Sequence, residues 1–189
     1  MSVLFIIILF HILLLITNKF KRFSYLTGAI LIIKWFYTYF SISYFSFKFL
    51  LIFVFAYIGG AYFTYINAYF LKLYTMSPSE ALKKFYLTVE EVIFITAEEI
   101  IWRGIIQSYF LLNGSSNLII FAIKLIIVSV LFVIVHDLKN PKQKIELTIF
   151  SILLSILALT FGNILPSIGL HLGRNSYIKY LLMKTKKFN

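Results

Sequence analysis

The chain has 189 residues, of which 61% are hydrophobic and only 13% are charged. A soluble globular domain carries roughly a quarter charged residues, so the composition excludes an ordinary water-soluble domain. The formal net charge is +11, but in so apolar a chain the basic residues indicate cytoplasmic loops that meet anionic headgroups, and no nucleic-acid partner is expected. The absence of cysteine excludes disulfides, thiolate metal sites and thiol catalysis.

Apolar segments long enough to cross a bilayer recur along the whole chain. They predict an all-α, polytopic transmembrane helical bundle in which residues 1–189 form a single membrane domain. The first segment lacks a basic leading region and a small-residue cleavage site, so we expect a retained helix and no removed signal peptide. Seven spans are expected, at approximately 3–17, 25–45, 47–73, 88–112, 117–136, 144–161 and 163–183.

The basic residues support this division of the chain. Lysine and arginine gather after the first, third, fifth and seventh spans, whereas the other connections are short and nearly uncharged. The positive-inside rule then places the N-terminus outside and the C-terminus in the cytoplasm.

A short interfacial helix is expected between the third and fourth spans. Ser77 is a candidate N-cap, Pro78 suits the first helical position, and Glu80 completes a capping-box pattern. The helix is expected to run through Leu82 to Phe85 and to lie at the headgroups.

Four of the seven acidic residues fall in the fourth span. Glu90 and Glu91 lie near its beginning and are expected to be interfacial. Glu98 and Glu99 lie deeper, where insertion of a charge costs about 2.5–3.5 kcal/mol. A carboxylate at that depth is expected to be functional.

Helical geometry gives the two deep glutamates different roles. Arg103 is about 40° around the helix from Glu99 and can form an i,i+4 ion pair with it, as structural support for the site or as a staple between helices. Glu98 is about 140° away from Arg103 and is left free on another face, as suits a general base.

Histidines on two later spans can meet this glutamate. His136 ends the fifth span, one turn after Phe132, while His171 and Asn175 share a face in the middle of the seventh span. An imidazole and an amide on one face can bind a water, a metal or an oxyanion, although each histidine taken alone could also serve packing. Their depths agree with that of Glu98, so we expect one cavity in the cytoplasmic half of the membrane.

Other intramembrane hydrolases do not match this sequence. The zinc motif HExxH is absent, and Asp137 is the only aspartate, which excludes an aspartyl dyad. No serine nucleophile is expected at 114–116, a short external loop. His11 has no ionisable neighbour at helical spacing, and we expect it to pack or to form a hydrogen bond.

Three motifs follow one another on three separate spans: EExxxR at 98–103, FxxxH at 132–136 and HxxxN at 171–175. In this order they resemble the CPBP family, the CAAX-prenyl endopeptidase and bacteriocin-processing (Abi) membrane proteins. The resemblance covers the second half of the chain. Residues 88–183 thus carry the expected catalytic helices, whereas 1–74 carry no motif.

The resemblance implies hydrolysis of a peptide bond inside the membrane, on a hydrophobic or membrane-associated peptide or protein substrate. Glu98 would be the base, and His136 would help to hold the attacking water. His171 and Asn175 would stabilise the oxyanion. The residues that it implies are catalytic Glu98, His136, His171 and Asn175, with supporting Glu99, Arg103 and Phe132.

A metal stays open at this stage. Members of this family are often called metallopeptidases, and Glu98, His136 and His171 could supply three ligands and leave an open position, as catalytic zinc requires. A metal-free glutamate mechanism would use the same residues.

The biological role has alternatives. The compact size and the Ile/Lys/Phe/Asn/Tyr bias favour a bacterial plasma membrane and a role in bacteriocin processing, leader removal or self-immunity over true prenyl-protein processing. A non-enzymatic immunity or scaffold protein that keeps the fold is the second hypothesis. A small proton-coupled transporter is the third, disfavoured because paired broken helices and repeats are lacking.

Overall fold

The structure is a computed structural model that describes residues 28, 30, 47–73, 75–107, 118–136 and 138–185. The elements of this part are all helices: α3 (Phe47–Phe70), α4 (Pro78–Ala81), α5 (Val89–Glu99), the π-helix η2 (Ile100–Gln107), α7 (Leu118–Ile134), α8 (Pro141–Phe161) and α9 (Leu165–Thr185). The all-α prediction is therefore confirmed for the described residues. The spans expected at 3–17 and 25–45, with His11, and the loop 114–116 lie outside the described residues, apart from positions 28 and 30.

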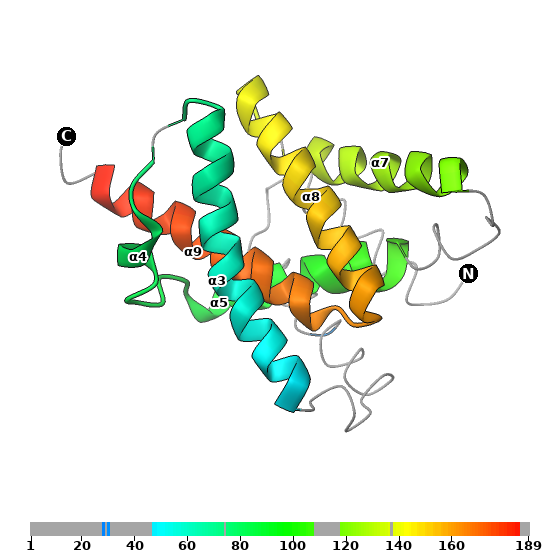
Figure 1. Cartoon of the computed structure of the whole chain (residues 1–189), viewed down its shortest axis with the longest axis horizontal. Coiled ribbons are helices and arrows are strands. Elements are labelled where there is room, and N and C mark those ends of the chain that lie inside the picture. Colours follow the sequence, from blue (N-terminus) through cyan, green and yellow to red (C-terminus); the bar gives the residue numbers. More distant parts are fainter. Residues whose placement is uncertain are drawn as a thin grey trace.

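Helix α9 is the central element of the bundle. It packs against α3, α5 and α8, and most of its side chains as far as Tyr180 are buried. Figure 1 shows α9 running across α3, with α8 beside them and α7 crossing α8 at a steep angle. Hydrogen bonds fix α9 to its neighbours; for example, Tyr57 Oη donates to Ser176 Oγ over 3.0 Å, and Tyr177 Oη donates to the Met76 carbonyl over 2.7 Å.

Glycines let α3 and α9 approach until their backbones touch. A Cβ atom added at Gly60 would lie 2.1 Å from the Leu170 carbonyl oxygen, and one added at Gly173 would lie 1.9 Å from the Tyr57 carbonyl oxygen. Small residues at helix crossings permit such close approach in membrane bundles. The contact matters for the site because α9 carries His171 and Asn175.

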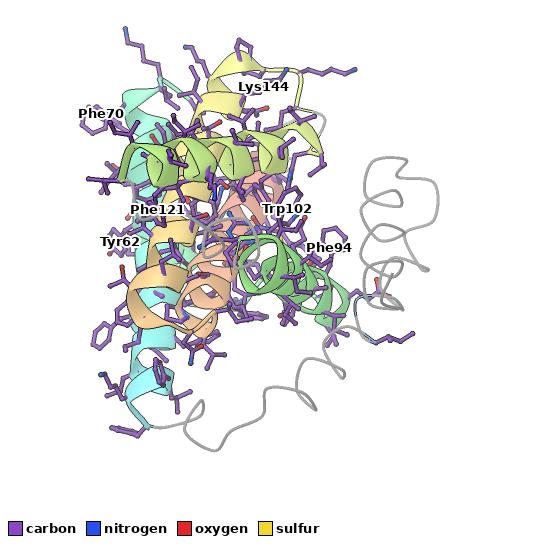
Figure 2. The ribbon with its side chains drawn as sticks, turned by 90° about the vertical axis from the view of Figure 1, so that its right-hand side faces the viewer. Tyr62, Phe70, Phe94, Trp102, Phe121 and Lys144 are labelled. Atoms are coloured by element: carbon purple, nitrogen blue, oxygen red, sulfur yellow. The ribbon has the colours of Figure 1, made fainter. Side chains whose placement is uncertain are left out.

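Two of the described helices, α3 and α8, are long and apolar enough to cross a membrane. Helix α3 turns large apolar side chains outward, among them Phe55 and Phe70, and Figure 2 shows Tyr62 and Phe70 pointing away from the bundle. The exposed face of α7, which is shorter, is likewise formed by isoleucine, leucine and valine. Contiguous apolar surfaces of this kind suit contact with lipid and not with water. Seven spans with the N-terminus outside stay a prediction.

Helix α4 begins at Pro78 with Ser77 at its N-cap position, as predicted, but the prediction is wrong in the length of the helix and in the expected capping bonds. Helix α4 ends at Ala81, and the Ser77 hydroxyl contacts Ser79 Oγ at 2.8 Å without capping the helix. Glu80 pairs instead with Lys83 over 2.5 Å, so neither expected cap residue binds a first-turn amide.

The capping box of the described chain lies at Thr88, before α5. Glu91 N donates to Thr88 Oγ1 over 3.3 Å, and Thr88 N donates to a Glu91 carboxylate oxygen over 2.6 Å. This reciprocal pair starts the helix that carries Glu98 and Glu99.

Two further helix boundaries differ from the sequence prediction. The fourth span is α-helical only as far as Glu99 and continues as η2, in which hydrogen bonds run from i to i+5. Helix α8 begins at Pro141 and not at Lys144, because Asn140 Oδ1 accepts the Lys142 amide and proline suits the first turn.

Candidate active site

Glu98 meets two histidines from two other helices. The residue lies near the end of α5, and its Oε1 is 3.5 Å from Nε2 of His136, which lies just after α7. Its Oε2 is 4.0 Å from Nε2 of His171 in the middle of α9. The Glu98 and His171 side chains are buried, whereas the His136 side chain is 26% exposed. The predicted convergence of these three side chains is therefore confirmed.

Hydrogen-bond partners define how the two imidazoles are protonated. Nδ1 of His136 lies 2.7 Å from the Phe132 carbonyl oxygen, and Nδ1 of His171 lies 2.7 Å from Glu99 Oε1. A carbonyl and a carboxylate only accept, so each Nδ1 carries a proton and donates. In the neutral rings both Nε2 atoms are then acceptors, and both face Glu98.

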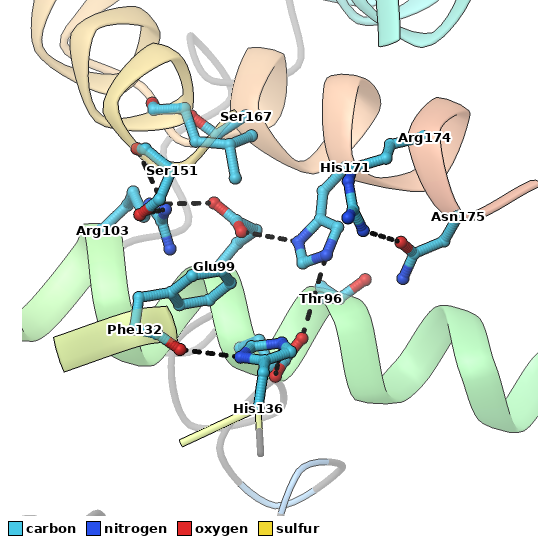
Figure 3. Close-up of polar contacts among 12 residues, drawn as sticks. Thr96, Glu99, Arg103, Phe132, His136, Ser151, Ser167, His171, Arg174 and Asn175 are labelled. Carbon is cyan, nitrogen blue, oxygen red and sulfur yellow. Dashed lines mark hydrogen bonds and ion pairs between the residues drawn. The ribbon is translucent and has the colours of Figure 1, made fainter. Parts of the chain in front are cut away.

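Glu99 links a cation to a histidine. Its Oε2 lies 3.6 Å from Nε of Arg103, which confirms the predicted i,i+4 ion pair between two fully buried side chains. Its other oxygen holds His171, as Figure 3 shows. Glu99 thus fixes the tautomer and the orientation of His171, which gives the supporting role expected for Glu99 a specific partner.

Phe132 packs among the charged groups of the site. Its ring lies 4.5 Å from the His136 ring, and the Arg103 guanidinium lies over its face at 4.4 Å. On the other side Trp102 meets it edge-on at 5.6 Å. The supporting role expected for Phe132 has a physical basis in these contacts, since a buried aromatic face stabilises the cation and restricts the imidazole.

A ladder of polar contacts joins η2 to α8. Arg103 donates to the carbonyl oxygen of Ser151 over 3.2 Å and to its Oγ over 2.8 Å. One turn later, Gln107 Nε2 donates to the Ser155 carbonyl over 3.0 Å. The wider helical turn of η2 is therefore compatible with two successive contacts along one face of α8.

The two serines of this ladder should respond differently to alanine. Ser151→Ala removes a hydrogen bond from a buried guanidinium, and we expect a loss of about 1.5–3 kcal/mol in the free energy of unfolding. Ser155→Ala is the matched control, because the Ser155 hydroxyl is buried without a hydrogen-bond partner among the described residues and its removal should be neutral or stabilising. Thermal unfolding in detergent measures both. Equal destabilisation by the two substitutions would contradict the ladder.

Asn175 lies at the wall of a cavity, and the described residues that line this cavity do not include Glu98 or His171. The cavity has a volume of about 700 Å³ and is also lined by His136, Glu146 and Arg174. The amide oxygen of Asn175 accepts a hydrogen bond from Arg174 over 3.1 Å. The structure thus gathers Glu98, His136 and His171 directly and places Asn175 one helical turn along α9 from His171.

Sequence reasoning missed an ion pair at this wall. Arg174 of α9 donates from Nε and from an Nη to the two carboxylate oxygens of Glu146 on α8, over 3.1 and 2.5 Å. Opposite charges within two predicted spans were the available signal, since charges inside a bundle pair with one another.

Glu98, His136 and His171 are the side chains that the sequence offered as candidate ligands for a metal ion. Across the residues that the structure describes, no group of three or more His, Cys, Asp or Glu side chains is placed to hold a metal ion. The mechanism proposed for this site uses the side chains of Glu98, His136 and His171 and has no step through a metal.

Comparison with protein families matches residues 83–177, about half of the chain, to the type II CAAX prenyl endopeptidase Rce1-like family. The matched segment runs from the end of α4 through α5, η2, α7 and α8 into α9, and it contains all three motifs. Neither the curated proteins nor the solved structures give a match. The chain belongs to the Rce1-like type II CAAX prenyl endopeptidases, a family of peptide-cleaving enzymes.

Proposed function

We propose that this protein is an intramembrane endopeptidase that hydrolyses a peptide bond with a water activated by Glu98. The observation that supports it is the arrangement of one buried carboxylate facing Nε2 of both His136 and His171, with each Nδ1 held by an acceptor. The separations of 3.5 and 4.0 Å are wide for direct hydrogen bonds and suit a bridging water.

In this mechanism the water donates one hydrogen bond to Glu98 and the other to Nε2 of His136. As its oxygen attacks the scissile carbonyl carbon, a C–O bond forms and the carbonyl π pair moves onto oxygen. Glu98 takes the proton that the water loses. A positioned base of this kind contributes about 10²–10⁴ in rate.

The negative charge that develops on the carbonyl oxygen needs donors. Asn175 can donate from Nδ2, and His171 can donate from Nε2 after it has taken a second proton from solvent, with Glu99 balancing the imidazolium. One such donor contributes about 3–4 kcal/mol. Collapse of the intermediate breaks the C–N bond, Glu98 returns its proton to the leaving nitrogen, and the products are a carboxylic acid and an amine.

The cavity supports a hydrophobic, membrane-associated peptide as substrate. Its wall combines His136 and Asn175 with apolar side chains from several elements, such as Phe94, Leu147 and Ile178. Within this proposal, bacteriocin processing or self-immunity in a bacterial plasma membrane is the role that the composition favours.

The proposal is tested with the full chain reconstituted in lipid vesicles. Prenylated and unprenylated hydrophobic peptides are supplied, and the fragments are identified by mass spectrometry. We expect cleavage by the wild type and a loss of about 10²-fold or more in kcat for His136→Ala. A cellular phenotype that persists in a cleavage-deficient variant would instead favour the non-enzymatic immunity or scaffold role.

Metal dependence is measured in the same vesicles after exhaustive chelation. If Glu98 and His136 activate the water without a metal, turnover persists after chelation. Turnover that is lost and then restored by zinc would instead assign the water to a metal held by Glu98, His136 and His171.

A further inference from the structure

Each of the three nitrogens of the Arg174 guanidinium donates a hydrogen bond at the cavity wall. Nε and Nη2 donate to the two carboxylate oxygens of Glu146, over 3.1 and 2.5 Å, and Nη1 donates to Asn175 Oδ1 over 3.1 Å. All three nitrogens therefore have acceptors from two helices. The planar fork of arginine suits such a fixed, bidentate arrangement, which a lysine cannot reproduce.

The pair is held firmly in place. The side chains of Arg174 and Glu146 are 12% and 6% exposed, and the guanidinium lies over the ring of Phe150 at 5.0 Å. Phe150 is itself fully buried and contacts the His171 ring at 5.7 Å between centroids. Two well-packed apolar side chains often stabilise a folded protein as much as a buried ion pair does, or more. A contribution to stability alone therefore explains the presence of these two charges poorly.

The contact with Asn175 decides which way its amide points. Arginine carries donors only, so the amide atom that faces Arg174 must be the oxygen. The Nδ2 group is then left as the free end of the side chain, and Asn175 lines the cavity. Without the guanidinium, the amide could turn over and present its oxygen, which would repel an oxyanion.

We propose that Glu146 and Arg174 are positioning residues that hold the Asn175 amide with its Nδ2 donor toward the scissile carbonyl. This inference rests on the proposed function. Glu146 fixes the guanidinium, the guanidinium fixes Oδ1, and neither residue touches the substrate. The pair therefore acts on the transition state only through Asn175.

The test is a double-mutant cycle between the ion pair and Asn175. Glu146→Gln/Arg174→Gln removes the guanidinium without leaving a buried carboxylate unpaired, and we expect kcat to fall roughly 10- to 100-fold with KM unchanged. Asn175→Ala should lower kcat by at least as much. The combination of all three substitutions should be no slower than Asn175→Ala alone, because the pair has nothing left to position.

Two further variants complete the design. Arg174→Lys keeps the positive charge beside Glu146 but replaces the planar guanidinium with a single ammonium group, so it should lower kcat as Glu146→Gln/Arg174→Gln does. It tests the same role if the double variant does not fold. Glu80→Gln/Lys83→Gln is the matched control, since it removes an exposed ion pair between α4 and the turn that follows it and should leave kcat and KM unchanged.

Three results would overturn the positioning role. They are multiplicative losses in the combined variant, a rise in KM with kcat unchanged, and a lowered unfolding temperature with normal kcat in the folded fraction. Failure of the proposed function looks different, because the wild type itself would then cleave no peptide. If the wild type cleaves and Asn175→Ala is fully active, only the positioning role is lost.

Discussion

Replacement of Glu98 by glutamine is expected to lower kcat for peptide cleavage by about 10³-fold or more, with little change in KM. Glutamine keeps the shape of the side chain but cannot take a proton from the attacking water. The histidines on either side should stay in place, because the Phe132 carbonyl and Glu99 hold them through Nδ1. Single-turnover cleavage in vesicles, followed by mass spectrometry, measures the loss.

The stability of the same variant separates a catalytic role from a structural one. A buried carboxylate that faces the Nε2 atoms of two imidazoles is costly, so Glu98→Gln should unfold at the same temperature as the wild type or higher. Glu90→Gln is the matched control, because it makes the same chemical change at an exposed side chain in the first turn of α5. Full activity in Glu98→Gln, or equal losses in both variants, would contradict the assignment of Glu98 as the base.

The meeting of Glu98 with His136 and His171 could be predicted from depth and from the order of the three motifs. Each residue type is rare inside a membrane, and all three were expected in one half of it, His136 at the end of its span and Glu98 and His171 deeper. The i,i+4 pair of Glu99 and Arg103 was also predictable, since it depends only on spacing within one helix. The second contact does not depend on how the helices are rotated against one another, and for the first contact the rotation was implied by the motifs alone.

The roles of the outer groups could not be predicted, because they depend on rotation and on local backbone geometry. The bond from Glu99 to His171 needs α5 and α9 to face each other, and the contact of Arg103 with Ser151 depends on a helix that becomes a π-helix after Glu99. Helix periodicity and capping rules assume the α-helical turn, so they do not predict the change to a π-helix.

The cap at Thr88 illustrates a different difficulty. Both Ser77–Glu80 and Thr88–Glu91 have the spacing of a capping box, but Glu80 is taken by Lys83, whereas Glu91 binds the Thr88 amide and also pairs with Lys179 of α9. The competition between partners for one carboxylate is decided in three dimensions. Pattern alone could not choose between the two sites.

The second large effect is expected where α3 crosses α9, through Gly60→Ala. The new methyl would lie 2.1 Å from the Leu170 carbonyl oxygen and 3.0 Å from the Arg174 amide nitrogen, and both are backbone atoms that cannot move alone. Helix α9 must therefore shift, at a cost of about 3 kcal/mol or more in the free energy of unfolding. Because the displaced turn carries His171, any folded protein should also lose about 10²-fold in kcat.

The adjacent residue provides a control with the same substitution in the same helix. A Cβ atom at Gly59 would meet only the Leu170 side chain, at an ordinary 3.7 Å, so Gly59→Ala should keep its activity. It should also be neutral or more stable by up to about 1 kcal/mol, since alanine favours a helix over glycine. Thermal unfolding and the cleavage rate of the two variants are compared in the same detergent. Similar behaviour of the two would mean that the helices have room to separate, and the close crossing would then not be what holds His171 beside Glu98.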